Sequence, residues 1–500
     1  MEIPKEQWGS RLGYLFAALG MVIGTGNIWR FPRVCAANGG GAFLIAWTIA
    51  MLIYAVPLLM SEMVLGKKTR LGTIGAFRDF CGRKFTWMGI WVCAVCLMLM
   101  SYYSVVMAYC LKYFTVSFTD FAPHMTTEIT TSIWEGFIGS PAQVVVFNLI
   151  CMAVGCFVVY KGVTNGIEKW CKVLIPSLFV LLVIIAIYAI SLNGSHQGLQ
   201  FLFGIDMSYL TKSATWLNAF TQAAWSTGAG WGFIVTYSVY VRKDEDIPNN
   251  CMIMGLGDNI GALVAALAVL PAIFALSPSL EAAQAAMSAD NYGMTFIYLY
   301  QLFSTMPMGR VISALFFFCM ATAALTSLFS MIEVGVRNLM DLGMTRKKAT
   351  LWTCGVGFLI GCFSAWSLHN LKNQDWVWGL GLMVSGLIIA VAVLKYGVEK
   401  VRREEINVEG ADFRVGKWYY NTCMRLIPII VVVMLGWWAV QSIGWYPETW
   451  WSPFEAENLG TVLLQFAVVL AISFGLNKKL SKKVNRGPIT GKDPEGGTLF

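Results

Sequence analysis

Charged residues are scarce in this chain, which argues against a soluble fold. Asp, Glu, Lys and Arg make up 13% of the 500 residues, whereas 57% are hydrophobic and the mean hydropathy is +0.63. Soluble domains carry about 25% charged residues, and about 20 apolar residues suffice to cross a bilayer. The composition therefore predicts an all-α polytopic membrane protein that has the lipid bilayer as a partner.

Histidine is almost absent, and the cysteines show no ligand pattern. The three histidines, at positions 124, 196 and 369, fall in predicted loops or at helix ends without metal-ligand spacing. The long loop after the third apolar run contains no cysteine, so external disulfides are not expected. Cys93 and Cys96 form a CxxC pair without a second pair or a histidine. These absences argue against an enzyme and against a metal centre built from cysteine or histidine.

Twelve apolar runs are long enough to span a membrane. They are expected at about 12–36, 41–66, 87–116, 143–160, 172–192, 215–240, 252–277, 309–340, 349–368, 376–397, 424–445 and 459–477. With an inside N-terminus, only six of the 36 Lys and Arg residues fall on the outer side. Because this follows the positive-inside rule, the net charge of +8 reports topology and not nucleic-acid binding. We expect a plasma-membrane protein with both termini in the cytoplasm.

The first apolar run is interrupted by glycines. The stretch GMVIGTGNIWRFP, residues 20–32, contains Gly20, Gly24 and Gly26, which weaken a helix and permit unusual backbone conformations. A break at this depth must satisfy its peptide groups through protein, a cavity or a ligand. It would leave free carbonyls at the end of one half-helix and N–H groups with a positive dipole end at the start of the next. The sequence therefore predicts a site for an anion and a cation inside the membrane.

The sixth run repeats this pattern. Residues 222–232, QAAWSTGAGWG, again place three glycines in an apolar segment. Two interrupted segments, five spans apart, indicate an inverted-repeat transporter. The predicted organisation is a cytoplasmic start (1–11), two five-span repeats (12–192 and 215–397), a cytoplasmic loop (398–423), two further spans (424–477) and a basic cytoplasmic tail (478–500).

Polar side chains inside the apolar runs are candidates for the site, although each also has a structural interpretation. Glu62 is expected to accept hydrogen bonds from freed backbone amides, with Gln222 as a second buried support. Thr326 and Ser327 either bond to their own helix or complete an oxygen cage for a cation. Asp258 is either a helix-entry residue or part of the site.

The ordered motifs resemble the neurotransmitter:sodium symporter family. The resemblance covers nearly the whole chain and is densest at GTGNIWRFP (24–32), NGGGAF (38–43), STGAGWG (226–232) with the nearby Tyr240, and ALTS (324–327). It implies the LeuT-type fold, with a 5+5 inverted repeat, broken helices 1 and 6 and two additional helices, twelve spans in all. It also implies sodium-coupled transport.

The resemblance places two sodium sites and a substrate site on this sequence. The first sodium site would use Val22, Asn27, Ser226 and Asp258 together with the substrate carboxylate. The second would use Gly20, Ile23, Ala323, Thr326 and Ser327. The substrate would contact Val22, Thr25, Gly26, Leu99, Tyr103, Trp225, Ser226, Gly228, Trp231, Ser327 and Met331.

Gates and a hinge follow from the same resemblance. The outer gate would pair Arg30 with Asp375. The inner gate would pair Lys5 with Asp341, with Trp8 and Tyr240 beside them. A helix hinge would lie between Gly166 and Pro176.

Two positions refine the function that the resemblance implies. Family members that carry biogenic amines have an aspartate at position 24, whereas Gly24 leaves the sodium to be balanced by a substrate carboxylate. Trp47 replaces a tyrosine that helps to bind chloride in chloride-dependent members, and Asp258 could supply the fixed negative charge instead. We therefore expect a neutral, hydrophobic amino acid, two sodium ions and no chloride. An amino-acid sensor or a proton-coupled transporter with the same pocket is the alternative, and the protein is expected as a monomer or a weak dimer.

Overall fold

The computed structural model describes residues 6–485, in which nearly every apolar run is a helix. Within this range, extended backbone pairs only at an isolated antiparallel bridge between Gly40 and Ile205. The all-α prediction is therefore confirmed.

Within residues 6–485, ten continuous helical segments are long and apolar enough to cross a membrane. They comprise α3–η2–α4 (Gly41–Thr69), η3–α6 (Arg83–Thr119), α8 (Pro141–Tyr160), η4–α9 (Val163–Ser191), α13 (Ile247–Leu276), α16 (Gly309–Asp341), α17 (Arg346–Trp366), α18 (Leu368–Tyr396), α20 (Lys417–Trp445) and α21 (Leu459–Lys483).

The two remaining predicted spans are the interrupted ones. The first consists of α1 (Arg11–Val22), the π-helix η1 (Gly26–Arg30) and α2 (Phe31–Ala37). It is long and apolar enough to cross a membrane only when its two halves, Arg11–Val22 and Gly26–Ala37, are taken together, and these halves meet at a bend of 48°. The sixth consists of α11 (Ser213–Thr227) and α12 (Phe233–Ser238). At 1.5 Å per residue, the 15 residues of α11 extend only about 22 Å, less than the hydrocarbon core.

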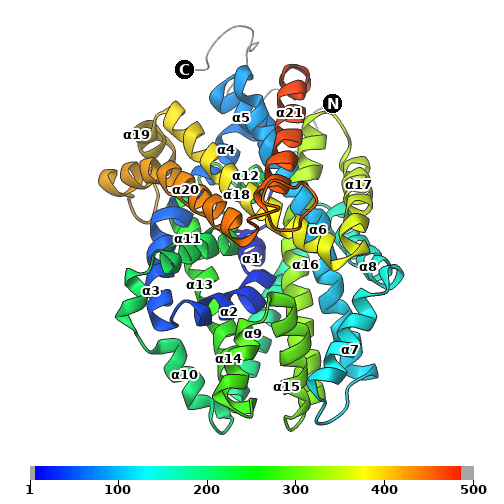
Figure 1. Cartoon of the computed structure of the whole chain (residues 1–500). Coiled ribbons are helices and arrows are strands. Elements are labelled where there is room, and N and C mark those ends of the chain that lie inside the picture. Colours follow the sequence, from blue (N-terminus) through cyan, green and yellow to red (C-terminus); the bar gives the residue numbers. More distant parts are fainter. Residues whose placement is uncertain (1–5, 486–500) are drawn as a thin grey trace.

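Shorter helices connect the spans at both ends of the bundle. They are α5 (Thr73–Cys81), α7 (Thr127–Ile138), α10 (Ser195–Phe203), η5 (Met207–Thr211), α14 (Leu280–Ser288), η6 (Gly293–Leu299), α15 (Tyr300–Ser304), α19 (Val398–Val401) and η7 (Arg402–Ile406). In Figure 1, α5 and α19 lie at one end of the molecule, whereas α10, α14 and α15 lie at the other.

The helices α6 and α16 form the centre of the bundle. In an apolar stretch of 18 residues in each of these helices, 83% of the stretch is buried inside the protein, compared with 28% in α20 and 22% in α21. The last two spans are therefore peripheral. Figure 1 shows α1 crossing close to α16 in the middle of the molecule. A cavity lies between this centre and the two interrupted spans.

The fifth span begins earlier than the sequence predicts. Its expected start was 172, after Glu168 and Lys169, but η4 begins at Val163 and continues directly into α9. The carboxylate of Glu168 is buried with hydrogen-bond partners, including Lys172 Nζ at 2.6 Å. Because polar residues that have hydrogen-bond partners can lie inside a span, the charged residues Glu168 and Lys169 do not mark where the fifth span begins.

Candidate binding site

The first interruption is built by residues 23–26. The regular hydrogen bonds of α1 end at Ile23, whose amide donates to Leu19 O at 2.8 Å. The Gly24 amide turns to the side chain of Asn27 and donates to its Oδ1 at 3.1 Å. The chain then resumes as the π-helix η1, a wide turn that is often found at functional sites.

The second interruption depends on glycines in left-handed conformations. Gly228, Gly230 and Gly232 have φ values of +65°, +97° and +76°, which other residues rarely adopt. Glu62 of α4 is fully buried and accepts hydrogen bonds from the amides of Gly230 at 2.5 Å and Gly232 at 3.1 Å. Gln222 is equally buried, but neither of its amide atoms has a hydrogen-bond partner within residues 6–485.

A cavity of about 580 Å³ lies between the two interruptions. Ten of the eleven predicted substrate-contact residues line it: Val22, Thr25, Gly26, Tyr103, Trp225, Ser226, Gly228, Trp231, Ser327 and Met331. Leu99 is fully buried but is not among the lining residues. The lining also includes Tyr102, Val106, Phe233 and Leu380, which the sequence prediction missed because they belong to none of its motifs.

The floor of the cavity leaves no room for a side chain at position 24. The Tyr103 hydroxyl accepts hydrogen bonds from the Thr25 amide and the Thr25 hydroxyl, both at 3.1 Å. A Cβ at Gly24 would lie 2.8 Å from Tyr103 Oη and 3.0 Å from Ser327 Oγ. At Gly26, by contrast, an added Cβ would meet nothing within 4 Å. The free space therefore lies beside Gly26.

Three residues of the predicted first sodium site are in contact. Asp258 Oδ1 accepts hydrogen bonds from Asn27 Nδ2 and from Ser226 Oγ, each at 2.7 Å. Asp258 Oδ2 is buried and has no partner among the described residues. The fourth residue, Val22, offers its carbonyl at the same break, where it accepts from the Gly24 amide at 3.2 Å. A buried carboxylate oxygen without a donor, with the Ser226 hydroxyl oxygen bonded to the same carboxylate, fits a hard cation.

Residues of the predicted second sodium site meet where α16 faces α1. Ser327 Oγ donates to the carbonyls of Gly20 and Met21, both at 3.3 Å. Thr326 Oγ1 donates to its own helix, to Ala323 O at 3.1 Å, which is the structural interpretation of this hydroxyl; the oxygen cage for a cation stays a prediction. Ile23 lies at the end of α1, next to these oxygens. Within residues 6–485 no group of three His, Cys, Asp or Glu residues could hold a metal, and the donors here are all oxygens.

The residues of the predicted outer gate lie apart. Arg30 and Asp375 both line the cavity, but no ion pair within 4.0 Å joins them in the described part of the chain. The Arg30 guanidinium instead lies 5.3 Å from the centre of the Trp225 ring. At this end the cavity reaches Lys372, which pairs with Asp290 at 2.7 Å and is one-third exposed. Burial raises the pKa of the neighbouring Glu457 carboxyl, and Lys372 opposes this shift.

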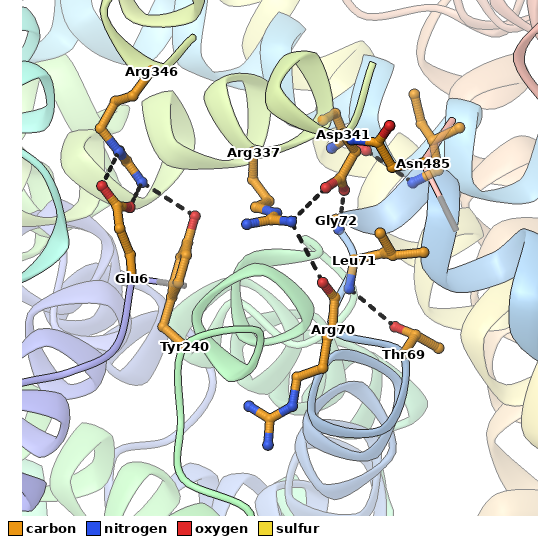
Figure 2. Close-up of polar contacts among 12 residues, drawn as sticks. Glu6, Thr69, Arg70, Leu71, Gly72, Tyr240, Arg337, Asp341, Arg346 and Asn485 are labelled. Atoms are coloured by element: carbon orange, nitrogen blue, oxygen red, sulfur yellow. Dashed lines mark hydrogen bonds and ion pairs between the residues drawn. The ribbon is translucent and has the colours of Figure 1, made fainter. Parts of the chain in front are cut away.

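The opposite end is closed around Trp8. Its side chain is buried and its Nε1 donates to Tyr237 O at 3.0 Å. Tyr240 donates its hydroxyl to the buried Glu333 at 2.5 Å, and Arg346 binds Glu333 at 2.7 Å. Arg346 also pairs with Glu6 and donates to the Tyr240 hydroxyl at 3.2 Å (Figure 2). The sequence prediction missed this charged cluster, although Glu333 in an apolar run is the same kind of signal as Glu62.

Asp341 is fixed by partners other than the predicted one. It binds Arg337 at 2.5 Å and accepts from the Gly72 amide at 2.6 Å (Figure 2). Lys5, its predicted partner, lies outside the described residues. Of the predicted hinge residues, Gly166 is in the π-helix η4 and Pro176 is inside α9.

Taken together, these features define a class of protein. Two interrupted helices face each other across a buried cavity that has an apolar wall and oxygen groups at its floor. The bundle is closed around Trp8 at one end, and the cavity reaches partly exposed residues at the other. This is the architecture of a membrane transporter with the LeuT fold.

Comparisons with known proteins agree. The model of the sodium:neurotransmitter symporter family matches residues 5–136 and 132–482, so the chain belongs to this family. An uncharacterized sodium-dependent transporter, YhdH of Bacillus subtilis, is 31% identical over 85% of this chain and 95% of its own length. The sodium-dependent neutral amino acid transporter B(0)AT2 of Mus musculus is 23% identical over 86% of this chain and 72% of its own length. The crystal structure of MhsT in complex with L-phenylalanine superposes with a TM-score of 0.76, at 28% identity, over 86% of this chain and 99% of that one.

Proposed function

We propose that the protein is a symporter that imports a neutral, hydrophobic amino acid by alternating access, driven by two sodium ions and independent of chloride. The observation that carries the proposal is the pair of oxygen clusters beside the cavity floor, one around Asp258 and one around Ser327. We place the protein in the plasma membrane, with both termini in the cytoplasm.

The cavity supports an amino acid as substrate. Gly24 leaves no side-chain charge at the floor, so a cation bound there would be balanced by a carboxylate on the substrate. Trp225, Trp231 and Met331 give the wall an apolar character, which suits a hydrophobic side chain. The relative that is described as a neutral amino acid transporter and the neighbour bound to L-phenylalanine point in the same direction.

The sodium ions would supply positive charge beside the floor of the cavity. At the first site, Asp258 Oδ2 and the oxygens of Asn27 and Ser226 would hold the ion next to the substrate carboxylate. At the second, the carbonyl of Gly20 and the hydroxyls of Thr326 and Ser327 would hold an ion that bridges α1 to α16. Because Asp258 carries a fixed negative charge, no chloride is needed to balance the first ion.

Uptake of L-phenylalanine into proteoliposomes tests the proposal. We expect accumulation when sodium is high outside, and none when potassium replaces it or when only a proton gradient is imposed. The double variant Thr326→Ala, Ser327→Ala should abolish this uptake, whereas Ser177→Ala, a hydroxyl that bonds only within its own helix on an exposed face, should not. Proton-driven uptake would favour the proton-coupled alternative, and sodium-dependent binding without uptake would favour a sensor.

A further inference from the structure

The buried carboxylate of Glu168 ties the start of α1 to the start of the fifth span. Only 2% of this side chain is exposed. Its Oε2 accepts a hydrogen bond from the Gly9 amide at 2.6 Å, and its Oε1 accepts from the Ser10 hydroxyl at 2.9 Å. Lys172, one turn along α9, donates to Oε1 at 2.6 Å. One carboxylate therefore holds partners from two separate parts of the chain.

A second contact and the local glycines support this connection. Thr164 donates its hydroxyl to Gln7 O at 2.7 Å, so both ends of the π-helix η4 touch residues 7–10. A Cβ at Gly13 would lie 2.1 Å from Glu168 Oε1; glycine at this position makes room for the carboxylate. Ser10 is also the N-cap of α1 and accepts from the Gly13 amide at 3.0 Å.

The position of this contact links it to the transport cycle. The α1 helix extends from its N-cap Ser10 to the interruption at residues 23–26, and Trp8, just before it, is buried against Tyr237 at the closed end of the bundle. Opening that end requires residues 7–10 to leave η4 and α9. When they leave, Glu168 loses Gly9 and Ser10 but keeps Lys172, which belongs to its own segment. The buried charge would thus retain a partner in both states, which limits the cost of breaking the contact.

We propose that Glu168 is a positioning residue that holds the start of α1 closed, and that Lys172 retains the carboxylate when α1 is released. This inference rests on the proposed alternating-access function. It predicts opposite effects for the two residues. Removing the carboxylate favours release of α1, whereas removing Lys172 leaves the released carboxylate without a partner and favours the closed state.

Two measurements on the full-length protein test the proposal. In Glu168→Gln, hydrogen exchange at the amides of residues 9–13 should rise about tenfold or more, because the Gly9 amide loses its charged acceptor. Binding of L-phenylalanine should weaken about tenfold at low sodium and recover to within about twofold at saturating sodium, because sodium selects the closed, binding-competent state. Glu135→Gln makes the same chemical change at an exposed position and should alter neither measurement.

Lys172→Met provides the opposing test. We expect L-phenylalanine binding at low sodium to be unchanged or tighter, with a maximal uptake rate at least about threefold lower. If Glu168→Gln does not fold, Thr164→Val should shift exchange in the same direction by a smaller factor. Unchanged exchange at residues 9–13, or increased exchange without any change in sodium dependence, would overturn the proposal. If hydrogen exchange rises in Glu168→Gln but the unsubstituted protein binds no L-phenylalanine in the presence of sodium, the proposed substrate is wrong, whereas the role of Glu168 in holding the start of α1 is supported.

Discussion

Gly24 lies where the cavity floor is most crowded. An added Cβ would be 2.8 Å from Tyr103 Oη and 3.0 Å from Ser327 Oγ, and both hydroxyls already hold α1 through hydrogen bonds. A side chain at this position therefore displaces groups that belong to the proposed substrate and sodium sites.

We predict that Gly24→Ala weakens L-phenylalanine binding by about 5- to 150-fold, since overpacking costs about 1–3 kcal/mol. Equilibrium binding with saturating sodium provides the measurement. Gly355→Ala, in a helix where an added Cβ meets nothing within 4 Å, should bind as the parent does. Equal affinity for the two variants would show that the floor is not part of the binding site.

Asp258 supports a second prediction at this scale. Its carboxylate joins Asn27 and Ser226, and a hydrogen bond to a charged group is worth about 1.5–3 kcal/mol. We therefore expect Asp258→Ser to lose sodium-driven uptake by about 100-fold in gluconate buffer and to regain a large part of it in chloride, which would supply the missing negative charge. If the unsubstituted protein itself needs chloride, Asp258 is not the fixed counter-charge.

Sequence motifs locate the residues of the cavity better than they locate its gates. The glycine interruptions point to Thr25, Gly26 and Gly228, all of which line the cavity, because a broken helix is encoded locally. Of the partners of Asp341, Arg337 lies four residues earlier in α16, a spacing that could have indicated the pair. The Gly72 amide comes from a separate segment, and no spacing in the sequence specifies a contact of that kind.

At the scale of elements, the α11–α12 interruption depends on support from α4. Glu62 accepts from two amides that the positive-φ glycines release from helical bonding. The sequence already indicates a buried carboxylate and freed amides, and the structure brings them into contact. The π-helices η1 and η4 could not be predicted, because their wider turns follow from tertiary contacts and have no composition of their own.

We predict that Glu62→Ala destabilises the protein by about 2–6 kcal/mol, because two buried N–H groups lose their acceptor at about 1–3 kcal/mol each. The apparent melting temperature in detergent, followed by tryptophan fluorescence, should fall well below that of the parent. Glu281→Ala, at an exposed position in α14, serves as the control. A melting temperature shared by the two variants would mean that the interruption holds without Glu62.

On the scale of the whole molecule, the two ends of the cavity differ. At one end Trp8, Tyr240, Glu333 and Arg346 form a closed network; Figure 2 shows Arg346 with Tyr240 and Glu6. At the other, Arg30 and Asp375 line the cavity without pairing. Alternating access would require the closed end to open while the other end closes. The number of coupled sodium ions determines how much free energy is available to accumulate the substrate.

The number of coupled ions sets a limit on accumulation that can be measured. A tenfold sodium gradient provides about 1.4 kcal/mol per ion, and a potential of 100 mV adds about 2.3 kcal/mol per charge. Two ions then provide about 7 kcal/mol, enough to concentrate a zwitterion about 10⁵-fold. We predict that the limiting accumulation of L-phenylalanine in tight proteoliposomes rises about 100-fold for each tenfold increase in the sodium gradient at fixed potential. A tenfold rise would mean that one ion is coupled, and the oxygen cluster around Thr326 and Ser327 would then serve packing between α1 and α16.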